Sequence, residues 1–357
     1  MFGSYLTQWD LLVIVFYFVF QFSLGFIFKA FSKDASDYFR GGGSMLWWLV
    51  GASAFMTQFS AWTFTGAAGK AYVDGTLVMA IFFGNALGYF CNYLYTSYRY
   101  RRMRVVTAIE GVRDRFGPVN EQVFTWLQVP MSVVYAGIWL NGLGIVASSF
   151  FNVDPSFTVL IVGVVVVLMS VMGGSWAIVA SDFMQTLLLM SITLVACFVA
   201  LSHPAVDGRS GLLTKLPEGH LRPWDAEDAT FVYFWIFAAF VIQSCKLNNM
   251  FDAYRYLCVK DDKQARKASL MASSLMFLGP FIWFIPPMAA RIIQPDLALV
   301  FPELGDKAYE GAFVFIGLEL MPLGMVGLLL CALFAATISS MDTGLNRNAG
   351  IIVKNFY

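Results

Sequence analysis

Long apolar stretches alternate with polar connections along almost the whole chain. Several of these stretches exceed the roughly 20 residues that a helix needs to cross the hydrocarbon core of a bilayer, which predicts tilt or interruption. We place spans, within a few residues, at 8–29, 46–69, 76–98, 121–149, 157–173, 180–202, 230–250, 268–290 and 311–342. The pattern therefore predicts an all-α integral membrane protein with about nine transmembrane helices.

Composition supports a lipid-facing surface. Hydrophobic residues make up 59% of the chain and charged residues 13%, whereas a soluble domain carries about 25% charged residues. The net charge is zero, which argues against nucleic acid as a partner. The five cysteines are scattered without a CxxC spacing, and both histidines fall in one polar connection. A disulfide framework and an intramembrane metal enzyme are therefore not expected.

Basic residues are distributed unevenly between the connections. If the N-terminus lies outside, sixteen Lys and Arg residues fall on the cytoplasmic side, six fall on the exterior side, and Lys246 lies within a span. Cytoplasmic loops carry such an excess of Lys and Arg in membrane proteins. We therefore predict a multi-pass protein of the cell membrane, with its N-terminus outside and residue 357 on the cytoplasmic side.

The last span carries a polar cluster between Ala335 and Thr343. On a helix, Ala336, Ser339 and Ser340 share one face, and Asp342 and Thr343 follow Ser339 at the same spacing. Hydroxyl and carboxylate groups are costly at this depth unless they bind something. An oxygen-rich stripe suits a small hard cation, so we interpret it as a sodium site.

The second span is rich in small and hydroxyl residues from Gly51 to Gly66. One interpretation is close helix packing, because small side chains let two backbones approach each other. The other is a broken helix whose freed carbonyls and polar side chains line a solute cavity. The glutamine at position 58 and the number of hydroxyls favour the cavity.

Two further polar groups leave alternatives open. Asp182 and Gln185 share one face at the start of the sixth span, either as a solvated helix start or, with Asp342, as a second cation site. Lys246 and Asn249 lie near the end of the seventh span. Lys246 favours a snorkelling helix end, whereas the neighbouring asparagines favour an unwound segment that faces the solute.

With these residues assembled, the chain resembles the solute:sodium symporter family, which includes sodium/glucose, sodium/proline and sodium/sialate carriers. The resemblance covers nearly the whole chain in the right order. It rests on Trp47-Trp48-x-x-Gly51-x-Ser53 through Gly66, on Gly173-Gly174-Ser175-x-Ala177 through Asp182-x-x-Gln185, on Ala336-x-x-Ser339-Ser340 through Asn346, Asn348, Gly350 and Tyr357, and on the link from Arg255 to Lys267.

The resemblance implies a LeuT-type core of two inverted five-helix repeats, preceded by one extra helix. Residues 1–357 would then form a single transmembrane domain. Its extra helix would be 8–29, its first repeat 46–202, and its second repeat, only partly present, 230–342. The family continues with at least two more helices, so we expect the sequence to be a C-terminally truncated piece of a longer protein.

The resemblance also implies sodium ligands. The main sodium site corresponds to the backbone carbonyls of Met56, Phe59 and Ala336 and to the hydroxyls of Ser339 and Ser340. Members with a further sodium site use the aspartate that matches Asp182 together with hydroxyl residues. Here those hydroxyl positions are Asp342 and Thr343. The carboxylate of Asp342 is a departure that would strengthen cation binding, admit a proton or pair with an arginine.

Solute contacts are implied at five positions, which are Gln58, Thr63, Phe82, Asn85 and Asn249. Phe82 stands where sugar-transporting members have an acidic contact, which weakens the case for a hexose. Other polyols, organic acids and sialate-like acids remain open.

The predicted function is sodium-coupled symport of a small polar organic solute into the cell by alternating access. Sodium would be the coupling ion, no other cofactor is expected, and the partners would be sodium, the solute and the lipid bilayer. The alternative is a transporter-like membrane sensor domain of a longer signalling protein. An intramembrane enzyme is not expected, because no HExxH motif or catalytic Ser/His pairing is present.

Overall fold

The chain folds as a bundle of helices. The structure, a computed structural model, describes residues 6–29, 34–151, 154–225, 229–249, 251 and 254–355. In these ranges the one β-type pairing is an isolated bridge between Met45 and Val259. The predicted boundary residues Met250 and Tyr357 lie outside the described residues.

The elements follow one another without a strand in the described part of the chain. The α-helices are α1 (Gln8–Lys29), α2 (Ala35–Arg40), α3 (Trp47–Met56), α4 (Ala61–Phe64), α5 (Gly66–Asp74), α6 (Met79–Cys91), α7 (Ser97–Met103), α8 (Ala108–Phe116), α9 (Pro118–Phe151), α10 (Pro155–Ser202), α11 (Gly208–Lys215), α12 (Ala229–Leu247), α13 (Tyr254–Leu257), α14 (Asp262–Leu278), α15 (Pro280–Trp283), α16 (Ile285–Ile293), α17 (Ala312–Leu320) and α18 (Met325–Asn355). Tighter or wider turns form η1 (Gly41–Gly43), η2 (Gly75–Val78), η3 (Asn92–Thr96), η4 (Pro223–Asp225), η5 (Leu297–Leu299) and η6 (Pro302–Gly311).

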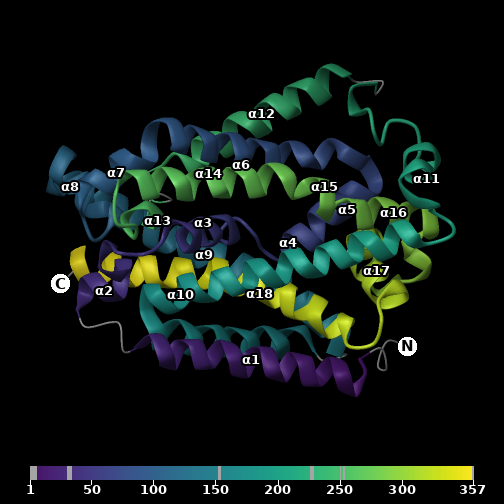
Figure 1. Cartoon of the computed structure of the whole chain (residues 1–357), viewed down its shortest axis with the longest axis horizontal. Coiled ribbons are helices and arrows are strands. Elements are labelled where there is room, and N and C mark those ends of the chain that lie inside the picture. The colour runs from purple at the N-terminus through teal and green to yellow at the C-terminus, as the bar shows by residue number, and fades with distance from the viewer. Residues whose placement is uncertain are drawn as a thin grey trace.

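The helices stack in layers across the bundle (Figure 1). The first helix, α1, packs along one edge against α10 and α18, and α10 packs in turn against α3. On the other side of α3 lie α14 and α6, and α12 forms the opposite edge against α6. The segments expected to bind sodium, α3 and α18, therefore lie in the interior of the bundle.

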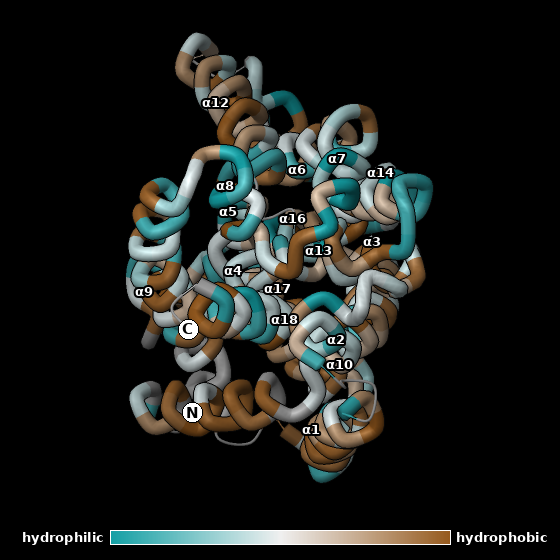
Figure 2. The backbone as a smooth tube through the Cα atoms, turned by 90° about the vertical axis from the view of Figure 1, so that its left-hand side faces the viewer, coloured by the Kyte–Doolittle hydropathy of each residue, from teal (hydrophilic) through white to brown (hydrophobic). Residues whose placement is uncertain are grey.

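Exposure follows this layering. In α18, residues such as Leu330, Ala332 and Ala336 are buried, whereas the edge helices expose large apolar side chains such as Phe16 in α1 and Phe234 in α12. Apolar side chains exposed in this way on the rim of a helical bundle suit contact with lipid. Figure 2 views one end of the bundle, where hydrophilic backbone segments gather around α7, α8 and α14.

Seven helical runs in the described residues are long and apolar enough to cross a membrane. They are Gln8–Lys29, Ala61–Met103, Pro118–Gly144, Gly173–Ser202, Ala229–Leu247, Asp262–Ile293 and Met325–Lys354. Shorter apolar helices, Trp47–Met56 and Val159–Leu168, account for the first half of the second predicted span and for the fifth. All nine predicted spans thus fall on helices, although the structure divides them differently.

The first predicted span coincides with α1, and the second is interrupted. The fifth and sixth spans join in α10, which is sharply bent at Gly174, where φ is 59° and ψ is −160°. A residue with a Cβ atom would be strained at these backbone angles, whereas glycine adopts them readily. A glycine is therefore what lets the two spans connect without an intervening loop.

The ninth predicted span, 311–342, was wrong as a single helix. The structure places α17 before a turn at residues 321–324 and α18 after it, and α18 continues to Asn355. The turn contains Pro322 and Gly324, whose φ is 84°. These residues are turn formers that outweigh the surrounding apolar pattern. Consequently the serine pair lies near the middle of α18 instead of close to its end.

Candidate functional site

The break in the second predicted span is built from hydroxyl residues. Helix α3 ends at Met56, and α4 begins only after Ser60, whose backbone is extended at φ −154° and ψ 175°. The Thr57 hydroxyl donates to the Ser53 carbonyl at 2.7 Å, and the Ala61 amide donates to the Thr337 hydroxyl at 3.0 Å. Side-chain oxygens compete with the helical ladder in this way. The break therefore faces α18.

Ser340 lies at the centre of the predicted main sodium site. Its hydroxyl contacts the carbonyl oxygens of Thr57 at 3.2 Å, of Ala336 at 3.5 Å and, more closely, of Phe59. A hydroxyl has a single proton, so it satisfies one of these carbonyls at a time. The cluster has more oxygen acceptors than hydrogens, and a small hard cation suits such a surplus.

Ser339 adds a further oxygen. Its hydroxyl is buried and, among the described residues, has no hydrogen-bond partner, although it lies close to the Asp182 carboxylate. An unpaired buried hydroxyl costs free energy unless something fills the place beside it. The carbonyl of the fifth predicted ligand, Met56, accepts the Phe59 amide at 2.9 Å. Ser340 thus meets the break at Thr57 and Phe59, whereas Ser339 lies beside Asp182 and the Met56 carbonyl is engaged within the break.

The predicted second sodium site contains an arginine that sequence reasoning did not place there. Nη2 of Arg255 lies 3.2 Å from Oδ2 of Asp182 and also donates to the hydroxyl of Thr343. The hydroxyl of Ser53 donates to the same carboxylate oxygen of Asp182. All four side chains are buried. A guanidinium therefore lies between two of the predicted ligands and links α3, α10, α13 and α18.

The third predicted ligand of that site, Asp342, is buried as well and lies near Tyr17 of α1. The structure therefore connects Asp182 and Thr343 through Arg255 and brings α1 near Asp342. The sequence pointed to Arg255 only as part of a cytoplasmic link, because nothing in its local pattern shows that it is 3% exposed.

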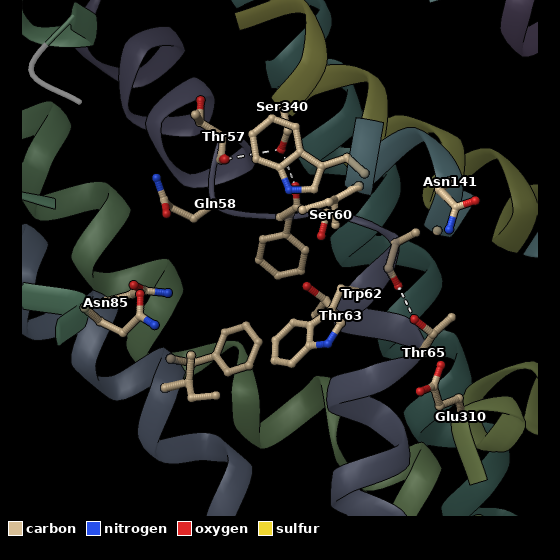
Figure 3. Close-up of a pocket in the computed structure, with 18 of the residues that line it drawn as sticks. Thr57, Gln58, Ser60, Trp62, Thr63, Thr65, Asn85, Asn141, Glu310 and Ser340 are labelled. Atoms are coloured by element: carbon tan, nitrogen blue, oxygen red, sulfur yellow. Dashed lines mark hydrogen bonds between the residues drawn. The ribbon is translucent and has the colours of Figure 1, made fainter. Parts of the chain in front are cut away.

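A cavity of about 540 Å³ opens beside the break (Figure 3). Gln58, Thr63, Phe82 and Asn85, four of the five predicted solute contacts, line it. Additional lining residues are Thr57, Phe59, Ser60, Ala61, Trp62, Thr65, Ile81, Ile138, Trp139, Asn141, Gly142, Gln243, Lys246, Lys307, Glu310 and Ser340. Because Ser340 belongs both to this wall and to the oxygen cluster, the cavity and the candidate sodium site are adjacent.

The fifth predicted solute contact, Asn249, is not in the cavity wall. Its side chain instead bonds the local backbone, donating to the Lys246 carbonyl at 2.7 Å and accepting from the Phe251 amide at 2.8 Å. An asparagine after a helix end commonly bonds its own backbone in this way. Lys246 is the residue of this segment that reaches the cavity.

Amide oxygens supply unmet hydrogen-bonding capacity in the cavity. Oδ1 of Asn85 in α6 and Oε1 of Gln243 in α12 are buried without a hydrogen-bond partner in the described part of the chain. The helices that carry them are in contact, with the Ser244 hydroxyl donating to the Gly84 carbonyl at 3.3 Å. Two such acceptors suit the hydroxyl or amide hydrogens of a polar solute.

Aromatic rings lie beside these polar groups, because Phe59 and Phe82 belong to the cavity wall and Trp283 packs against both. The rings of Phe59 and Trp283 lie 4.5 Å apart in an edge-to-face arrangement, and the ring of Phe82 lies 5.6 Å from that of Trp283. Phe82 therefore continues an aromatic cluster and supplies no polar group. A cavity with one aromatic wall and a few convergent polar groups is typical of a small-molecule site.

The two ends of the cavity differ. Lys307 and Glu310 of η6 line its outer end, in the connection predicted to be exterior. At the other end, beyond Ser340, lies the buried group of Ser53, Asp182 and Arg255. The cavity wall thus extends from Lys307 and Glu310 to Ser340, and the buried charged group lies next to the oxygen cluster.

Comparison with known proteins agrees with this geometry. The profile of the "Sodium:solute symporter family" matches residues 38–357. The chain is 27% identical to the sodium/myo-inositol cotransporter 2 of Sus scrofa, over 98% of this chain and 56% of that protein. It is 25% identical to the sodium/sialic acid symporter SiaT of Proteus mirabilis, over 94% of this chain and 68% of that protein. The chain thus spans little more than half to two thirds of the length of these relatives.

A solved structure of a Na⁺-coupled sialic acid symporter, described as a substrate-bound outward-open state, has the same fold. The TM-score is 0.82 at 22% sequence identity, and the alignment covers 98% of this chain and 75% of the other. That likeness establishes the LeuT-type fold, and the apolar helical runs agree with a multi-pass membrane protein. Because the family profile matches about nine tenths of the chain, the protein belongs to the sodium:solute symporter family.

Proposed function

We propose that the protein carries a small polar organic solute into the cell together with sodium, and that it is a carrier and not an enzyme. The observation that supports this most directly is the position of Ser340, which belongs both to the oxygen cluster between α3 and α18 and to the wall of the solute cavity. An ion bound there would touch both the break in the second span and α18. Ion and solute would therefore share one wall.

Coupling follows from that shared wall. Sodium would neutralise the surplus of carbonyl and hydroxyl oxygens and hold the break against α18. This would stabilise the state in which the cavity faces the exterior. A ligand that favours the solute-binding state raises solute affinity by the same factor by which solute raises ion affinity. Low cytoplasmic sodium would then favour release of the ion, followed by the solute.

We propose Met56, Phe59, Ala336, Ser339 and Ser340 as the sodium ligands. Asp182 and Thr343 would form a second cation site only after Arg255 moves away, because a guanidinium and a sodium ion compete for the same carboxylate oxygen. Release of Arg255 would also remove its contacts with α10 and α18. Asp342, which is buried near Tyr17 of α1, is the third candidate ligand of that second site.

The solute class follows from the cavity. Gln58, Asn85 and Gln243 offer amide groups, Thr63 offers a hydroxyl, and Lys246 offers one cation. Relatives are named for myo-inositol, sialic acid and glucose. We propose a polyol or an organic acid of that size, bound by the amides, with Lys246 favouring an acidic group.

The decisive experiment measures uptake of myo-inositol, glucose and sialic acid by the full-length protein in proteoliposomes, with and without an inward sodium gradient. Uptake of one solute should depend on the gradient. The double substitution Ser339→Ala with Ser340→Ala should raise the sodium concentration needed for half-maximal uptake about tenfold or more, equivalent to about 1.4 kcal/mol.

The matched control is Ser273→Ala in α14, which removes a buried hydroxyl that donates to the Ala86 carbonyl at 2.8 Å. It should leave the sodium dependence unchanged. Uptake that persists equally without sodium, or a sodium dependence unaltered by the double substitution, would contradict the proposed coupling site.

A further inference from the structure

Basic side chains from two distant parts of the sequence meet in a second cavity, of about 470 Å³. It lies at the hydrophilic end of the bundle seen in Figure 2, where α7 ends and α14 begins. Its lining consists entirely of charged residues, namely Arg101, Arg102, Arg104, Lys260, Asp261, Asp262 and Lys263. Five cations therefore surround it, against two carboxylates.

Both carboxylates already have partners. Asp261 begins α14 and accepts the Gln264 amide at 2.9 Å, as an N-cap residue does. Asp262 lies 2.6 Å from Nε of Arg102. In the described residues, no ion pair is formed by Arg101, Arg104, Lys260 or Lys263. The cavity consequently has a surplus of positive charge.

Arg101 and its neighbours concentrate this charge. Nη2 of Arg101 donates to the Lys260 carbonyl at 3.1 Å and to the Gly43 carbonyl at 3.4 Å, while its Nε is buried without a hydrogen-bond partner in the described part of the chain. Arg40 donates to the Arg104 carbonyl at 3.1 Å, and both Arg40 and Arg104 repel the charge of Arg101. Positive side chains held this close together create a positive potential that favours the binding of an anion.

The excess of basic residues in cytoplasmic loops does not by itself explain why these side chains share one cavity. Arginines that merely keep a loop in the cytoplasm need only be numerous near the ends of spans, and they can point apart into water. Here residues 101–104 and 260–263 converge on one cavity, and a backbone carbonyl of one segment fixes an arginine of the other. Residues 101–104 lie at the end of the helical run Ala61–Met103, and residues 260–263 lie at the start of the run Asp262–Ile293. Both runs are apolar enough to cross a membrane, so the cavity lies at the level of the lipid headgroups.

We propose that this cavity binds a phosphate-bearing anion, either the headgroup of an anionic lipid or free phosphate. Guanidinium groups match phosphate oxygens with two parallel hydrogen bonds, and basic pockets between helices on the cytoplasmic side bind such headgroups. The bound anion would hold the segment before α14 against the end of α7.

Binding is tested on the purified full-length protein by thermal unfolding and native mass spectrometry, which do not depend on the proposed transport activity. The probes are short-chain phosphatidylglycerol, short-chain phosphatidylcholine and inorganic phosphate. The pocket variant is Arg104→Gln with Lys263→Gln, because both side chains are exposed. The control is Arg115→Gln with Lys354→Gln, which removes the same charge from exposed positions outside the cavity.

Phosphatidylglycerol should bind the parent and the control equally and bind the pocket variant at least tenfold more weakly, with one lipid fewer in the mass spectrum. If inorganic phosphate stabilises the parent and not the pocket variant, the ligand is free phosphate. If only phosphatidylglycerol does so, the ligand is a lipid headgroup. Equal binding by parent and pocket variant, or equal stabilisation by phosphatidylcholine, would overturn the proposal.

An uptake arm rests on the proposed function. Vesicles that contain phosphatidylglycerol should support faster sodium-dependent uptake by the parent than vesicles of phosphatidylcholine alone, and the pocket variant should not respond to the lipid. Loss of uptake in every type of vesicle would contradict the proposed transport function, but it would leave the result of the lipid-binding and phosphate-binding measurements unchanged. A pocket variant that responds to phosphatidylglycerol like the parent would overturn the assignment of the site.

Discussion

Arg255 joins three segments of the chain through one buried nitrogen atom. Its Nη2 contacts Asp182 of α10 and Thr343 of α18, and Asp182 in turn accepts from Ser53 of α3. Removing one member of a buried ion pair leaves the other charge without compensation, which costs far more than loss of an exposed pair. The buried polar contact among α3, α10, α13 and α18 therefore depends on this single side chain.

Substitution of Arg255 by Gln should lower the free energy of unfolding by about 3–5 kcal/mol, because it leaves the Asp182 carboxylate buried and unpaired. Adding Asp182→Asn should recover part of that loss, since no unpaired charge then remains. Thermal unfolding of the purified protein measures both. Lys70→Gln, in a pair whose side chains are 58% and 38% exposed, should cost less than about 1 kcal/mol. A double variant as unstable as the single one would show that the carboxylate is not the cause.

The solute cavity shows how far residue type alone predicts which side chains line it. Gln58, Thr63, Phe82 and Asn85 were predicted from the resemblance and line the cavity, and Gln243 and Trp139 line it without having been predicted. Hydrogen-bonding capacity can be read from a residue type, but the direction of a side chain on a mostly apolar helix cannot. Asn249 has that capacity and directs it to its own backbone.

At the scale of elements, the first turn of α1 is hydrogen-bonded to the first turn of α18. One carboxylate oxygen of Asp10 accepts the Gly327 amide at 2.7 Å, and the other accepts the Thr7 amide at 2.9 Å. Gly327 lies in the first turn of α18, where backbone amides have no helical acceptor. The extra N-terminal helix thus supplies the cap of the helix that carries the serine pair.

Substitution of Asp10 by Ala should destabilise the protein by about 1–2 kcal/mol, because the Gly327 amide loses its acceptor in a buried place. Asp10→Asn keeps an oxygen acceptor and should cost clearly less. Amide hydrogen exchange at Gly327, together with thermal unfolding, separates local loosening from a general loss. Unchanged exchange at Gly327 in the Ala variant would show that α1 does not cap α18.

The bend in α10 provides a second test at this scale. A Cβ atom on Gly174 would lie 2.8 Å from the Tyr38 carbonyl oxygen, and its backbone angles are open essentially only to glycine. Gly174→Ala should therefore cost about 1–3 kcal/mol in thermal unfolding. Gly137→Ala, in α9 with nothing within 4 Å of the added carbon, should be neutral or stabilising. Equal stability of the two variants would contradict a bend that requires glycine.

At the scale of the whole molecule, the solute cavity and the basic pocket are lined by different segments of the chain. The cavity reaches Lys307 and Glu310 in the connection predicted to be exterior, while the pocket lies among segments predicted to be cytoplasmic. Under the proposed function, alternating access would open a route to one side while the route to the other side is closed. The orientation itself is still a prediction from the distribution of Lys and Arg.

Cysteine labelling tests that orientation. In a background without the native cysteines, a membrane-impermeant maleimide should label Ser210→Cys in α11 on intact cells. It should label Asp114→Cys in α8 only after permeabilisation, because α8 belongs to a predicted cytoplasmic connection. Both positions are exposed in the structure, so access is not limited by burial. The reverse pattern would place the N-terminus inside.

The sequence by itself determined the helical membrane architecture, the family, the broken second span and the serine pair. These are properties of local stretches, because hydropathy, hydroxyl content and glycine act over a few residues. The prediction from sequence was wrong for the ninth span, where one turn, from Pro322 to Gly324, divides an otherwise continuous apolar region into α17 and α18.

Only the tertiary structure decided that Arg255 lies between Asp182 and Thr343, that Gln243 faces the solute cavity, and that two basic segments share a pocket. Arg255 and Asp182 are 73 residues apart in the chain, and residues 101–104 and 260–263 are farther apart still. Which side chains meet over such separations is set by the packing of whole helices, and no local pattern encodes it.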